Sequence, residues 1–456
     1  MLTQELFEGL PVAGPETGET TNVKDICIDT RTLEEGDLFV ALTGQDDDGH
    51  NYLTEADGTA AAVLVESNRI DSLPSLSIPV FTTENTRDLL PDLLKSLYGD
   101  PSSSLALIGV TGTNGKTTTT HLIKSILKAE GESTGLIGTI ERRFKGETSK
   151  GDTTTPSIVE TYRLLQDWSE RGATAVVMEV SSHALDQGRV KGLSFAAAAF
   201  TNLSQDHLDY HDSMEAYYEA KKSLFDQSKK GVVYTDGEYG QRLAEEIEAV
   251  SVGESGDYTV KDPSVTLDGI DVTMSTPDDE TVQLHSPLTG LFNYRNITLA
   301  SALAYELGVS VDALREGVEE CAKVPGRCER LPGPPKVLVD YAHTPDALEN
   351  VITSIQPLVQ GRTLCVFGAG GDRDRGKRPK MGRIGTTEAD YAVITSDNPR
   401  SEDPQQIIDD ILEGVNGSSS YHVEPDRGQA IRDAIEKAED EDLVLIVGKG
   451  HETEQV

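Results

Sequence analysis

A lysine and a threonine end a glycine-rich stretch that could bind phosphate. The stretch reads Thr111-Gly-Thr-Asn-Gly-Lys-Thr117, follows an apolar run at 105–110 and precedes a helical pattern. A strand, a glycine-rich loop and a helix N-terminus in this order direct backbone N–H groups and the positive end of the helix dipole at an anion. We therefore expect Lys116 to reach the outer phosphates of a nucleoside triphosphate and Thr117 to hold Mg²⁺. The strict P-loop pattern is not met, because Val110 stands where its first glycine belongs, and a chance glycine turn is the alternative.

A carboxylate and a histidine follow two further apolar runs, where they could complete a metal site. Glu179 lies at the end of the run at 173–180, and His207 lies in Thr201-Asn-Leu-Ser-Gln-Asp-His-Leu-Asp-Tyr-His211, after the run at 195–200. Carboxylate oxygens favour Mg²⁺ over zinc. Taken alone, His207 is more often a structural or surface residue. Its expected place in the same sheet as Glu179 favours a metal or phosphate contact.

These residues lie among alternating apolar runs and amphipathic stretches, which predict an α/β fold with parallel sheets. We expect strands at 105–110, 173–180 and 195–200 in the middle of the chain, and at 336–339, 363–367, 391–395 and 443–447 in its last part. Each of the last four runs continues directly into polar or glycine-rich sequence. Ligands in open α/β sheets collect outside the carboxyl ends of the strands, so these four endings predict one composite site.

Two breaks in composition divide the chain into three predicted domains. The Pro/Ser-rich stretch 98–104 is typical of a linker, and the three prolines within 332–335 exclude regular structure there. The predicted domains are 1–101, 102–332 and 333–456.

The composition excludes several classes of function. The 456 residues include 78 acidic and 40 basic side chains, which give a net charge of −38 at pH 7. Nucleic acid is therefore not an expected partner, because binding its phosphates requires an excess of Lys and Arg. No apolar run approaches the roughly 18 residues of a membrane span, and no secretory signal is visible, so we expect a cytoplasmic protein. Cys321 and Cys328 lack the spacing of zinc ligands, and we expect them to pack in the interior.

The acidity itself has two interpretations. The acidic residues are scattered along the chain, which favours a solvated surface suited to a salty cytoplasm. A surface that binds cations or a basic partner is the alternative, and the absence of a long acidic block disfavours it.

Four segments in combination resemble the Mur ligases of cell-wall synthesis. They are Thr111-Gly-Thr-Asn-Gly-Lys-Thr117, Glu179-Val-Ser-Ser-His183, the segment 201–211 and Gly290-Leu-Phe-Asn-Tyr-Arg-Asn296, and the resemblance extends from Asp29 to Glu452. It implies an N-terminal domain that binds the UDP-substrate, a central P-loop-type ATPase domain and a C-terminal Rossmann-like domain that binds an amino acid. It also implies ATP-dependent amide formation on UDP-N-acetylmuramoyl-L-alanyl-D-glutamate in peptidoglycan precursor synthesis, with ATP and Mg²⁺.

The resemblance assigns a role to each residue that matches a family motif. The catalytic residues it implies are Lys116, Glu179, His207 and Lys221, and the metal ligands are Thr117, Glu179, His207 and Lys221. The ATP contacts it implies are Gly112, Thr113, Asn114, Gly115, Lys116, Thr117, Thr118, Asn293, Asn296, Arg327 and Asp340. The UDP-substrate contacts it implies are Thr30, Thr154, Thr155, Ser181, Gln187 and Arg189.

The segment Tyr217-Tyr-Glu-Ala-Lys-Lys-Ser-Leu-Phe225 resembles the family segment that bears a carbamylated lysine. This N6-carboxylysine would be Lys221, and its carboxylate could bind a second Mg²⁺ beside Glu179 and His207. Without the resemblance, Lys221 is an ordinary solvated helix residue. The neighbouring Lys222 leaves a one-residue ambiguity, which only the motif spacing decides in favour of Lys221.

The last domain indicates which amino acid is added. Meso-diaminopimelate differs from lysine by a distal carboxylate, so its site should combine an arginine fork with an acid for the distal ammonium. Arg400, in Asp397-Asn-Pro-Arg400, and Glu452 supply these charges, and 370–380 adds five basic and two acidic residues. A salt-bridged loop at Arg400 is the alternative. The resemblance to the diaminopimelate-adding branch implies the amino-acid contacts Arg373, Asp397, Asn398, Pro399, Arg400, Gly448 and Glu452.

Two other functions were weighed. Folylpolyglutamate synthetase or a lysine-adding ligase would share this scaffold, and Asp397-Asn-Pro-Arg400 argues against both. A non-catalytic nucleotide-binding regulator should have lost Lys116, Glu179 or Lys221, and all three are present. We therefore expect a monomeric enzyme whose partners are three small molecules: the UDP-muramoyl-dipeptide, meso-diaminopimelate and ATP.

Overall fold

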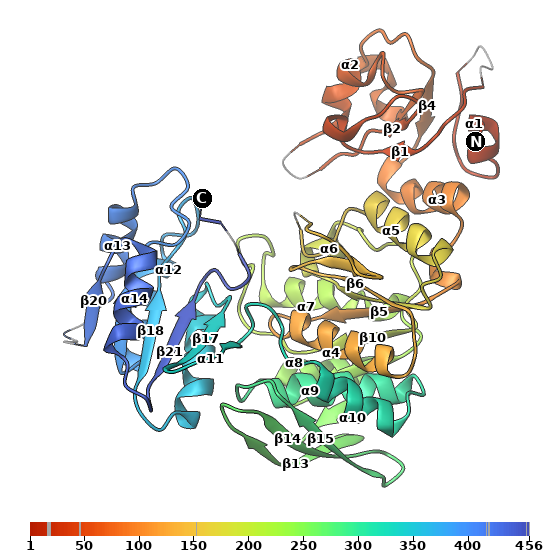
Figure 1. The fold of residues 1–456 in the computed structure, drawn as a ribbon. Helices are drawn as coiled ribbons and strands as arrows, with labels where there is room; N and C mark the ends of the chain where they lie inside the picture. The colour runs from red at the N-terminus through yellow and green to blue at the C-terminus, as the bar shows by residue number, and fades with distance from the viewer. Residues whose placement is uncertain are drawn as a thin grey trace.

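The computed structural model describes residues 1–15, 20–44, 47–151, 153–415, 417, 420–452 and 454–455. In this part of the chain, three β-sheets of four, eleven and six strands follow one another along the sequence. Figure 1 shows three bodies, of which the first lies beyond one end of the second and the third lies beside the second. The expected α/β class is confirmed, because helices alternate with largely parallel strands.

The first sheet has four parallel strands in the order β1-β2-β3-β4. Its strands are β1 (Ile26–Cys27), β2 (Leu38–Val40), β3 (Ala62–Glu66) and β4 (Val80–Thr83), and its helices are α1 (Thr3–Leu6), α2 (Leu53–Ala56) and α3 (Thr86–Tyr98). Successive side chains of a strand point to opposite faces. Leu38 and Val40 therefore pack in the cluster that includes α3, whereas Phe39 packs in the cluster that includes α2.

The stretch 98–104 connects the first sheet to the second. It contains the 3₁₀ helix η4 (Pro101–Ser103), in which Pro101 and Ser102 are buried. The Ser102 hydroxyl accepts a hydrogen bond of 3.0 Å from the backbone N–H of Ser194. The expected linker is thus fixed against the second sheet.

The second sheet has the order β15-β14-β13-β12-β11-β10-β5-β9-β6-β7-β8. Its strands are β5 (Ala106–Thr111), β6 (Thr134–Ile137), β7 (Arg142–Phe144), β8 (Glu147–Ser149), β9 (Ala175–Glu179), β10 (Ala197–Phe200), β11 (Gly231–Tyr234), β12 (Val250–Gly253), β13 (Tyr258–Val265), β14 (Ile270–Ser275) and β15 (Thr281–Ser286). Its helices are α4 (Lys116–Ala129), α5 (Ile158–Glu170), α6 (Ser182–Asp186), α7 (Met214–Lys222), α8 (Glu238–Glu246), α9 (Asn293–Glu306) and α10 (Val311–Glu320). The strands from β13 to β6 run parallel.

The strands expected at 105–110, 173–180 and 195–200 are β5, β9 and β10, with ends that differ by at most two residues. The apolar run at 195 begins before β10 because Phe195 forms only an isolated bridge with Ser228. Ile108 and Val110 of β5 pack against α4, and burying each such side chain contributes about 1.5–3 kcal/mol. This packing fixes β5 and α4 on either side of the glycine-rich loop.

The third sheet has the order β16-β17-β21-β18-β19-β20 and is parallel except for the pair β16 and β17. Its strands are β16 (Glu329–Leu331), β17 (Lys336–Asp340), β18 (Thr363–Phe367), β19 (Tyr391–Ile394), β20 (Tyr421–Val423) and β21 (Leu443–Val447). Its helices are α11 (Pro345–Ile355), α12 (Lys377–Glu388), α13 (Pro404–Leu412) and α14 (Arg427–Lys437).

The proline-rich break lies elsewhere in the fold than expected. Because β16 pairs with β17, the residues 332–335 form the turn of a hairpin inside the third sheet. The chain therefore passes from the second body to the third before Glu329. The prolines do exclude regular structure from the turn itself.

Two expectations from composition can be compared with the structure. None of the helices in the described ranges has both the length and the apolar character needed to cross a membrane. The four cysteines are buried and unpaired. Burial raises the pKa of the Cys321 thiol to about 12, which agrees with a packing role for this side chain.

Candidate active site

The glycine-rich loop lies between β5 and α4, in the strand–loop–helix order that the sequence predicts. Gly115 precedes the helix with a left-handed backbone (φ +85°), which glycine adopts without strain. Gly112 has φ +144°, and a side chain there would meet the hydroxyl of Thr201 at 1.9 Å. The loop is therefore pressed against the residues that follow β10, and Thr118 lies in the first turn of α4.

Two residues after β10 hold the loop in place. The Thr201 hydroxyl donates to the carbonyl oxygen of Asn114 at 2.6 Å. The Asn202 side-chain oxygen accepts from the Asn114 N–H at 3.0 Å, and the Asn202 carbonyl accepts from the Thr113 N–H at 2.9 Å. Thr201 and Asn202 are not among the predicted site residues, although their position directly after a strand is a usable signal.

Lys116 and Arg327 bring positive charge to this loop. Lys116 Nζ donates to the carbonyl oxygens of Gly112 and Thr113 at 2.9 and 2.8 Å, and burial lowers its pKa. Arg327 Nη2 lies 3.3 Å from the Thr117 hydroxyl, and its guanidinium stacks on Tyr341 at 4.8 Å. Its buried Nε has no hydrogen-bond partner among the residues that the structure describes. Both groups can therefore offer donors to an anion in the loop.

Glu179 ends β9 with its carboxylate beside the loop. It is 1% exposed, and its Oε2 accepts from the hydroxyls of Thr117 and Thr139 at 2.9 and 3.1 Å. Its Oε1 accepts from the Thr139 N–H at 2.8 Å. The sequence analysis missed Thr139, which follows β6 and so reaches the same sheet edge.

Lys221 lies beneath the loop, whereas Lys222 points elsewhere. Lys221 is 1% exposed, and its Nζ donates to the Gly112 carbonyl at 2.9 Å and lies 4.5 Å from the centre of the Tyr217 ring. Lys222 instead pairs with Glu246 at 2.6 Å. The structure thus distinguishes the two lysines that the sequence left ambiguous. Burial without a bonded carboxylate lowers the pKa of Lys221 well below its usual value.

His207 lies near Lys221 on a loop with a left-handed backbone (φ +52°). Its ring packs edge-on against His183 at 4.7 Å, and its Nε2 lies 3.5 Å from Asp206. Desolvation is the largest influence on His207 and lowers its pKa, although the side chain remains 44% exposed.

The carboxylates and histidines of this region do not by themselves form a compact metal site. Across the described ranges, the one group of three His, Cys, Asp or Glu ligands within mutual reach is His422, Glu424 and Asp433, in the third sheet. A metal ion beside Glu179 would therefore need oxygens from elsewhere, such as Thr117, a modified Lys221 or a bound phosphate.

The residues expected to contact the UDP-substrate fall into two places. Thr155 donates to the Glu179 carbonyl at 2.9 Å and accepts from the Ser181 N–H at 3.0 Å. Arg189 donates to the Thr155 carbonyl at 2.9 Å and to the Gln187 side-chain oxygen at 2.9 and 2.6 Å. Five of the six therefore lie together beside Glu179, since the hydroxyls of Thr139 and Thr154 are also hydrogen bonded, at 3.0 Å.

The sixth residue lies in the first body. Thr30 begins the 3₁₀ helix η1 (Thr30–Thr32), and its hydroxyl donates to Glu55 at 3.1 Å. Arg87 of α3 links the two places, because its Nη1 donates to the Gln187 carbonyl at 3.0 Å.

The remaining expected ATP contacts lie around the same loop. Asn293 and Asn296 are buried in the first turn of α9, and the Asn296 amide donates to Asn293 at 2.8 Å. A side chain on Gly115 would meet Asn296 Oδ1 at 2.4 Å, so this amide lies directly against the loop. Asp340 is buried at the end of β17, where burial raises its pKa and the N–H groups of Cys328 and Ala342 donate to it at 2.8 Å.

The expected amino-acid contacts gather at the carboxyl ends of β19 and β21. Asn398 donates to Glu452 at 2.9 Å, and Lys449 donates to Asn398 and Glu452 at 2.6 and 3.1 Å. Asp397 lies against Gly448, because a side chain on that glycine would meet Asp397 Oδ2 at 2.3 Å. Burial tends to raise the pKa of Glu452, but the hydrogen bonds from Asn398 and Lys449 lower it overall.

Arg400 and Arg373 lie at the outer edge of this site. Arg400 Nη1 donates to the Gly371 carbonyl at 2.7 Å, which ties the segment after β19 to the segment after β18. The half-buried Pro399 also touches Gly371. Arg373 is exposed, and its Nη1 donates to the Asp372 carbonyl at 3.1 Å.

The basic excess at 370–380 is partly neutralised within the fold. Arg378 is fully buried and pairs with Glu402 at 2.7 Å and with Asp410 at 2.8 Å. Arg375 pairs with the same Glu402 at 2.7 Å from a 66% exposed position. Two of the five basic residues thus hold the loop rather than face a ligand.

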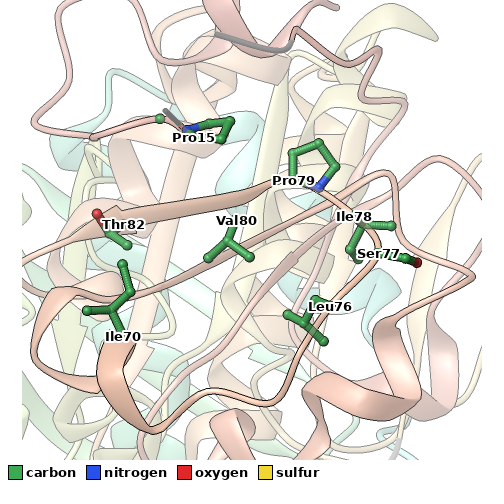
Figure 2. Close-up of a pocket in the computed structure, with 9 residues that line it drawn as sticks. Pro15, Ile70, Leu76, Ser77, Ile78, Pro79, Val80 and Thr82 are labelled. Atoms are coloured by element: carbon green, nitrogen blue, oxygen red, sulfur yellow. The ribbon is translucent and has the colours of Figure 1, made fainter. Parts of the chain in front are cut away.

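A hollow of about 400 Å³ lies in the first body, apart from these residues. It is lined mainly by apolar side chains of β4 and the segments beside it, among them Ile70, Leu76, Ile78 and Val80 (Figure 2). None of the expected site residues lines it. The candidate site is therefore the region around the glycine-rich loop together with the edge of the third sheet.

Comparisons with known proteins find two family models, one over the second sheet and one over the third. The family model described as "Mur ligase middle domain" matches residues 110–304, and "Mur ligase, glutamate ligase domain" matches residues 326–450. A UDP-N-acetylmuramoyl-L-alanyl-D-glutamate–2,6-diaminopimelate ligase from Synechococcus elongatus is 43% identical over 443 residues, which cover 94% of this chain and 89% of that protein.

Solved structures agree as well. A structure of a UDP-N-acetylmuramoyl-L-alanyl-D-glutamate–2,6-diaminopimelate ligase has 32% identity and a TM-score of 0.69, and the match covers 95% of this chain and 91% of that one. The MurF ligase of Thermotoga maritima in complex with ADP has 21% identity and a TM-score of 0.67 over 94% of both chains, which indicates a shared fold.

Proposed function

The chain belongs to the Mur ligase family, and from that premise we propose that it joins meso-diaminopimelate to UDP-N-acetylmuramoyl-L-alanyl-D-glutamate. It is an ATP-dependent ligase that forms an amide bond and releases ADP and phosphate. The observation that carries this conclusion is the 43% identity, over 94% of the chain, to a relative that bears the name of this ligase. The reaction belongs to the synthesis of peptidoglycan precursors.

The amino-acid end of the site suits a substrate with two carboxylates and two amines. Arg400 and Arg373 would offer guanidinium groups to a carboxylate, and Glu452 would accept a hydrogen bond from the distal ammonium. Lysine has no distal carboxylate and would leave the arginine fork unpaired, which disfavours its binding. Asp397, Asn398, Pro399 and Gly448 would shape the site between these charges.

ATP would bind at the glycine-rich loop. The N–H groups from Gly115 to Thr118 would bind the phosphates, while Lys116 and Arg327 would replace their bonds within the chain by bonds to phosphate oxygens. Asn293, Asn296 and Asp340 would contact the rest of the nucleotide. The proposed reaction begins when a carboxylate oxygen of D-glutamate attacks the γ-phosphorus, which forms an acyl phosphate and expels ADP. The amine of diaminopimelate then attacks the acyl carbon, loses a proton and expels phosphate.

The donor set fits Mg²⁺. The Thr117 hydroxyl and Glu179 Oε2 are oxygen donors that lie side by side, 2.9 Å apart, and Mg²⁺ prefers oxygen ligands. Thr117 and Glu179 would hold one ion, and His207 with carbamylated Lys221 would hold another. Bound Mg²⁺ would neutralise charge on the transferred phosphoryl group.

Carbamylation of Lys221 is the chemical step that this second position requires. The neutral amine attacks CO₂ and loses a proton, which leaves a carbamate. A buried amine whose pKa is lowered is neutral more often and so reacts more readily with CO₂. The hydrogen bond from Nζ to Gly112 would then be rearranged.

The UDP-substrate would extend from the first body to the loop. Thr30 would contact its uridine end, while Thr154, Thr155, Ser181, Gln187 and Arg189 would bind the muramoyl-dipeptide beside Glu179. We propose that the three predicted domains bind the UDP-substrate, ATP and the amino acid in this order, and that the boundary expected at 332 lies instead before β16, because β16 pairs with β17. Since the substrates are nucleotides and a free amino acid, we propose that the enzyme works in the cytoplasm. We also propose that it is a monomer.

The test is ADP release in the presence of Mg²⁺, ATP and UDP-N-acetylmuramoyl-L-alanyl-D-glutamate. Addition of meso-diaminopimelate should start the reaction, and L-lysine should support it at least tenfold less well. Equal rates would refute the specificity. Borohydride should trap the acyl phosphate as an alcohol when ATP is present and the amine is omitted, and failure to trap it would contradict the proposed intermediate. Activity should also persist in molar KCl if the acidic surface is a salt adaptation.

A further inference from the structure

The two halves of the amino-acid site come from strands that are not neighbours. Asp397 to Arg400 follow β19, and Gly448 to Glu452 follow β21, but β18 lies between these strands in the sheet. Strands separated by one other strand are about 10 Å apart. Hydrogen bonds of the sheet therefore cannot join the two segments directly. Beyond the strand ends, the side chains of Asn398, Lys449 and Glu452 bond to one another, and one further group joins the segments at the level of the strands.

Arg427 joins the two strand ends. It is the first residue of α14 and is 8% exposed. Its Nη1 donates to the carbonyl oxygen of Ser396 at 3.3 Å, and its Nη2 donates to the carbonyl oxygen of Val447 at 2.8 Å. Ser396 and Val447 directly precede Asp397 and Gly448, so one planar side chain holds both halves of the site.

Burial removes the charged guanidinium of Arg427 from water, which costs free energy, so its hydrogen-bond partners indicate its role. A buried charge is normally balanced by a bonded carboxylate, as in the pairing of Arg378 with Glu402 and Asp410. The hydrogen bonds of the Arg427 guanidinium in the structure go to main-chain carbonyls instead. Burial lowers its pKa, while the nearby charges of Asp397 and Glu452 act in the opposite direction. The group is thus placed beside the two acids of the amino-acid site.

We propose that Arg427 is a positioning residue that sets the distance between the segments 397–400 and 448–452 and thereby the affinity for diaminopimelate. A rigid guanidinium can donate to two carbonyls in fixed directions, whereas a lysine ammonium is a point charge on a flexible chain. Without Arg427, the two segments are joined only by the side-chain bonds of Asn398 with Lys449 and Glu452, and a displacement of about 1 Å is enough to lose a productive site. This inference rests on the proposed function.

The experiment compares Arg427→Ala and Arg427→Lys with Arg432→Ala. Arg432 is an exposed arginine on the same helix that bonds to Gln429, so its removal controls for loss of a charge from α14. We expect both Arg427 variants to raise the KM for meso-diaminopimelate at least tenfold, with the KM values for ATP and the UDP-substrate within twofold of wild type. Arg432→Ala should match wild type in all three.

Chemical rescue separates positioning from a loss of folding. Arg427 lines an open hollow of about 510 Å³ together with Ser396, Pro399 and Gln455, so a small guanidinium ion can enter the space that Arg427→Ala vacates. Millimolar guanidinium should lower the raised KM for diaminopimelate in this variant and leave Arg432→Ala unchanged. If Arg427→Ala does not fold, the KM values of Arg427→Lys decide the question.

The outcomes are distinguishable. A KM for diaminopimelate that changes less than twofold, or three KM values that rise together without rescue, would overturn the positioning role. If wild-type protein shows no ADP release that depends on diaminopimelate, the proposed function fails instead.

Discussion

Two arginines bond to the same carboxylate, and the difference in their burial predicts very different effects on stability. Arg378 is fully buried, and its guanidinium bonds to Glu402 at 2.7 and 3.0 Å and to Asp410 at 2.8 Å. Arg375 bonds to Glu402 at 2.7 Å, but its side chain is 66% exposed. The matched substitutions Arg378→Met and Arg375→Met remove one positive charge each.

The magnitude follows from what each substitution leaves behind. Without Arg378, the carboxylate of Asp410, which is 19% exposed, loses its ion-pair partner, and that of Glu402, which is 13% exposed, keeps only its bond to the exposed Arg375. Breaking a buried ion pair in this way costs about 3–5 kcal/mol of unfolding free energy. Arg375→Met removes an exposed contact that contributes about 0–1 kcal/mol. At about 3 °C per kcal/mol, we expect the melting temperature of the third body to fall by roughly 10–15 °C in Arg378→Met and by at most about 3 °C in Arg375→Met.

Thermal melts and urea titrations of the protein measure both effects, and the double variant Arg378→Met/Asp410→Asn tests their cause, because Arg378 is the ion-pair partner of Asp410. If an uncompensated carboxylate is the reason, the added Asp410→Asn should recover part of the loss. Equal shifts in the two single variants, or no recovery in the double variant, would refute the reasoning. Because Glu402 also accepts from the Asp372 N–H at 2.6 Å, we expect Arg378→Met to raise the KM for diaminopimelate as well.

Three further predictions concern acid stability, the loop and the modified lysine. The hydrogen bond from Arg378 is the largest cause that lowers the pKa of Glu402, to about 2. The stabilisation that ionised Glu402 gives the fold is therefore present above about pH 4.5 and is lost as the pH falls toward 2. Urea titrations across this range should show a steeper decline in unfolding free energy for wild type than for Arg378→Met. Gly115→Ala should raise the KM for ATP more than tenfold, because its Cβ would lie 2.4 Å from Asn296 Oδ1 at a φ of +85°. The control Gly131→Ala has a similar φ of +96° but open space around its Cβ, so it should affect stability alone. Lys221→Met should abolish ADP release and the mass gained with bicarbonate, whereas Lys222→Met should keep both; a bicarbonate adduct that persists in Lys221→Met would contradict the assignment.

Some strands could be predicted closely from sequence because burial on both faces gives a continuous apolar run. The segments 363–367 and 443–447 coincide with β18 and β21, which are fully buried. The strand β16 has no such run, since two of its three residues are exposed and it forms only by pairing with β17. The hairpin inside the third sheet was therefore read as a domain break.

The site could be predicted where residue type and position after a strand carry the signal, as for Lys116 and Glu179. The distinction between Lys221 and Lys222 depends on which face of α7 is buried, and adjacent residues share the same local sequence. Thr139 and Thr201 contribute by packing against Glu179 and the loop, which is a property of the tertiary structure. No sequence pattern predicts such a contact.

The arginines explain how a chain with a net charge of −38 can bind anionic substrates. In the third body, Arg378 and Arg427 are directed inward, to carboxylates in one case and to carbonyls in the other, and their charge is used to fix the loops. Arg373 and Arg400 are exposed on the loops so fixed. Arg373 and Arg378 both contribute to the basic excess at 370–380, but of the four arginines only the exposed pair can meet a ligand directly. Substitution of the buried pair should therefore change the geometry of the site, whereas substitution of the exposed pair should change the charge of the site.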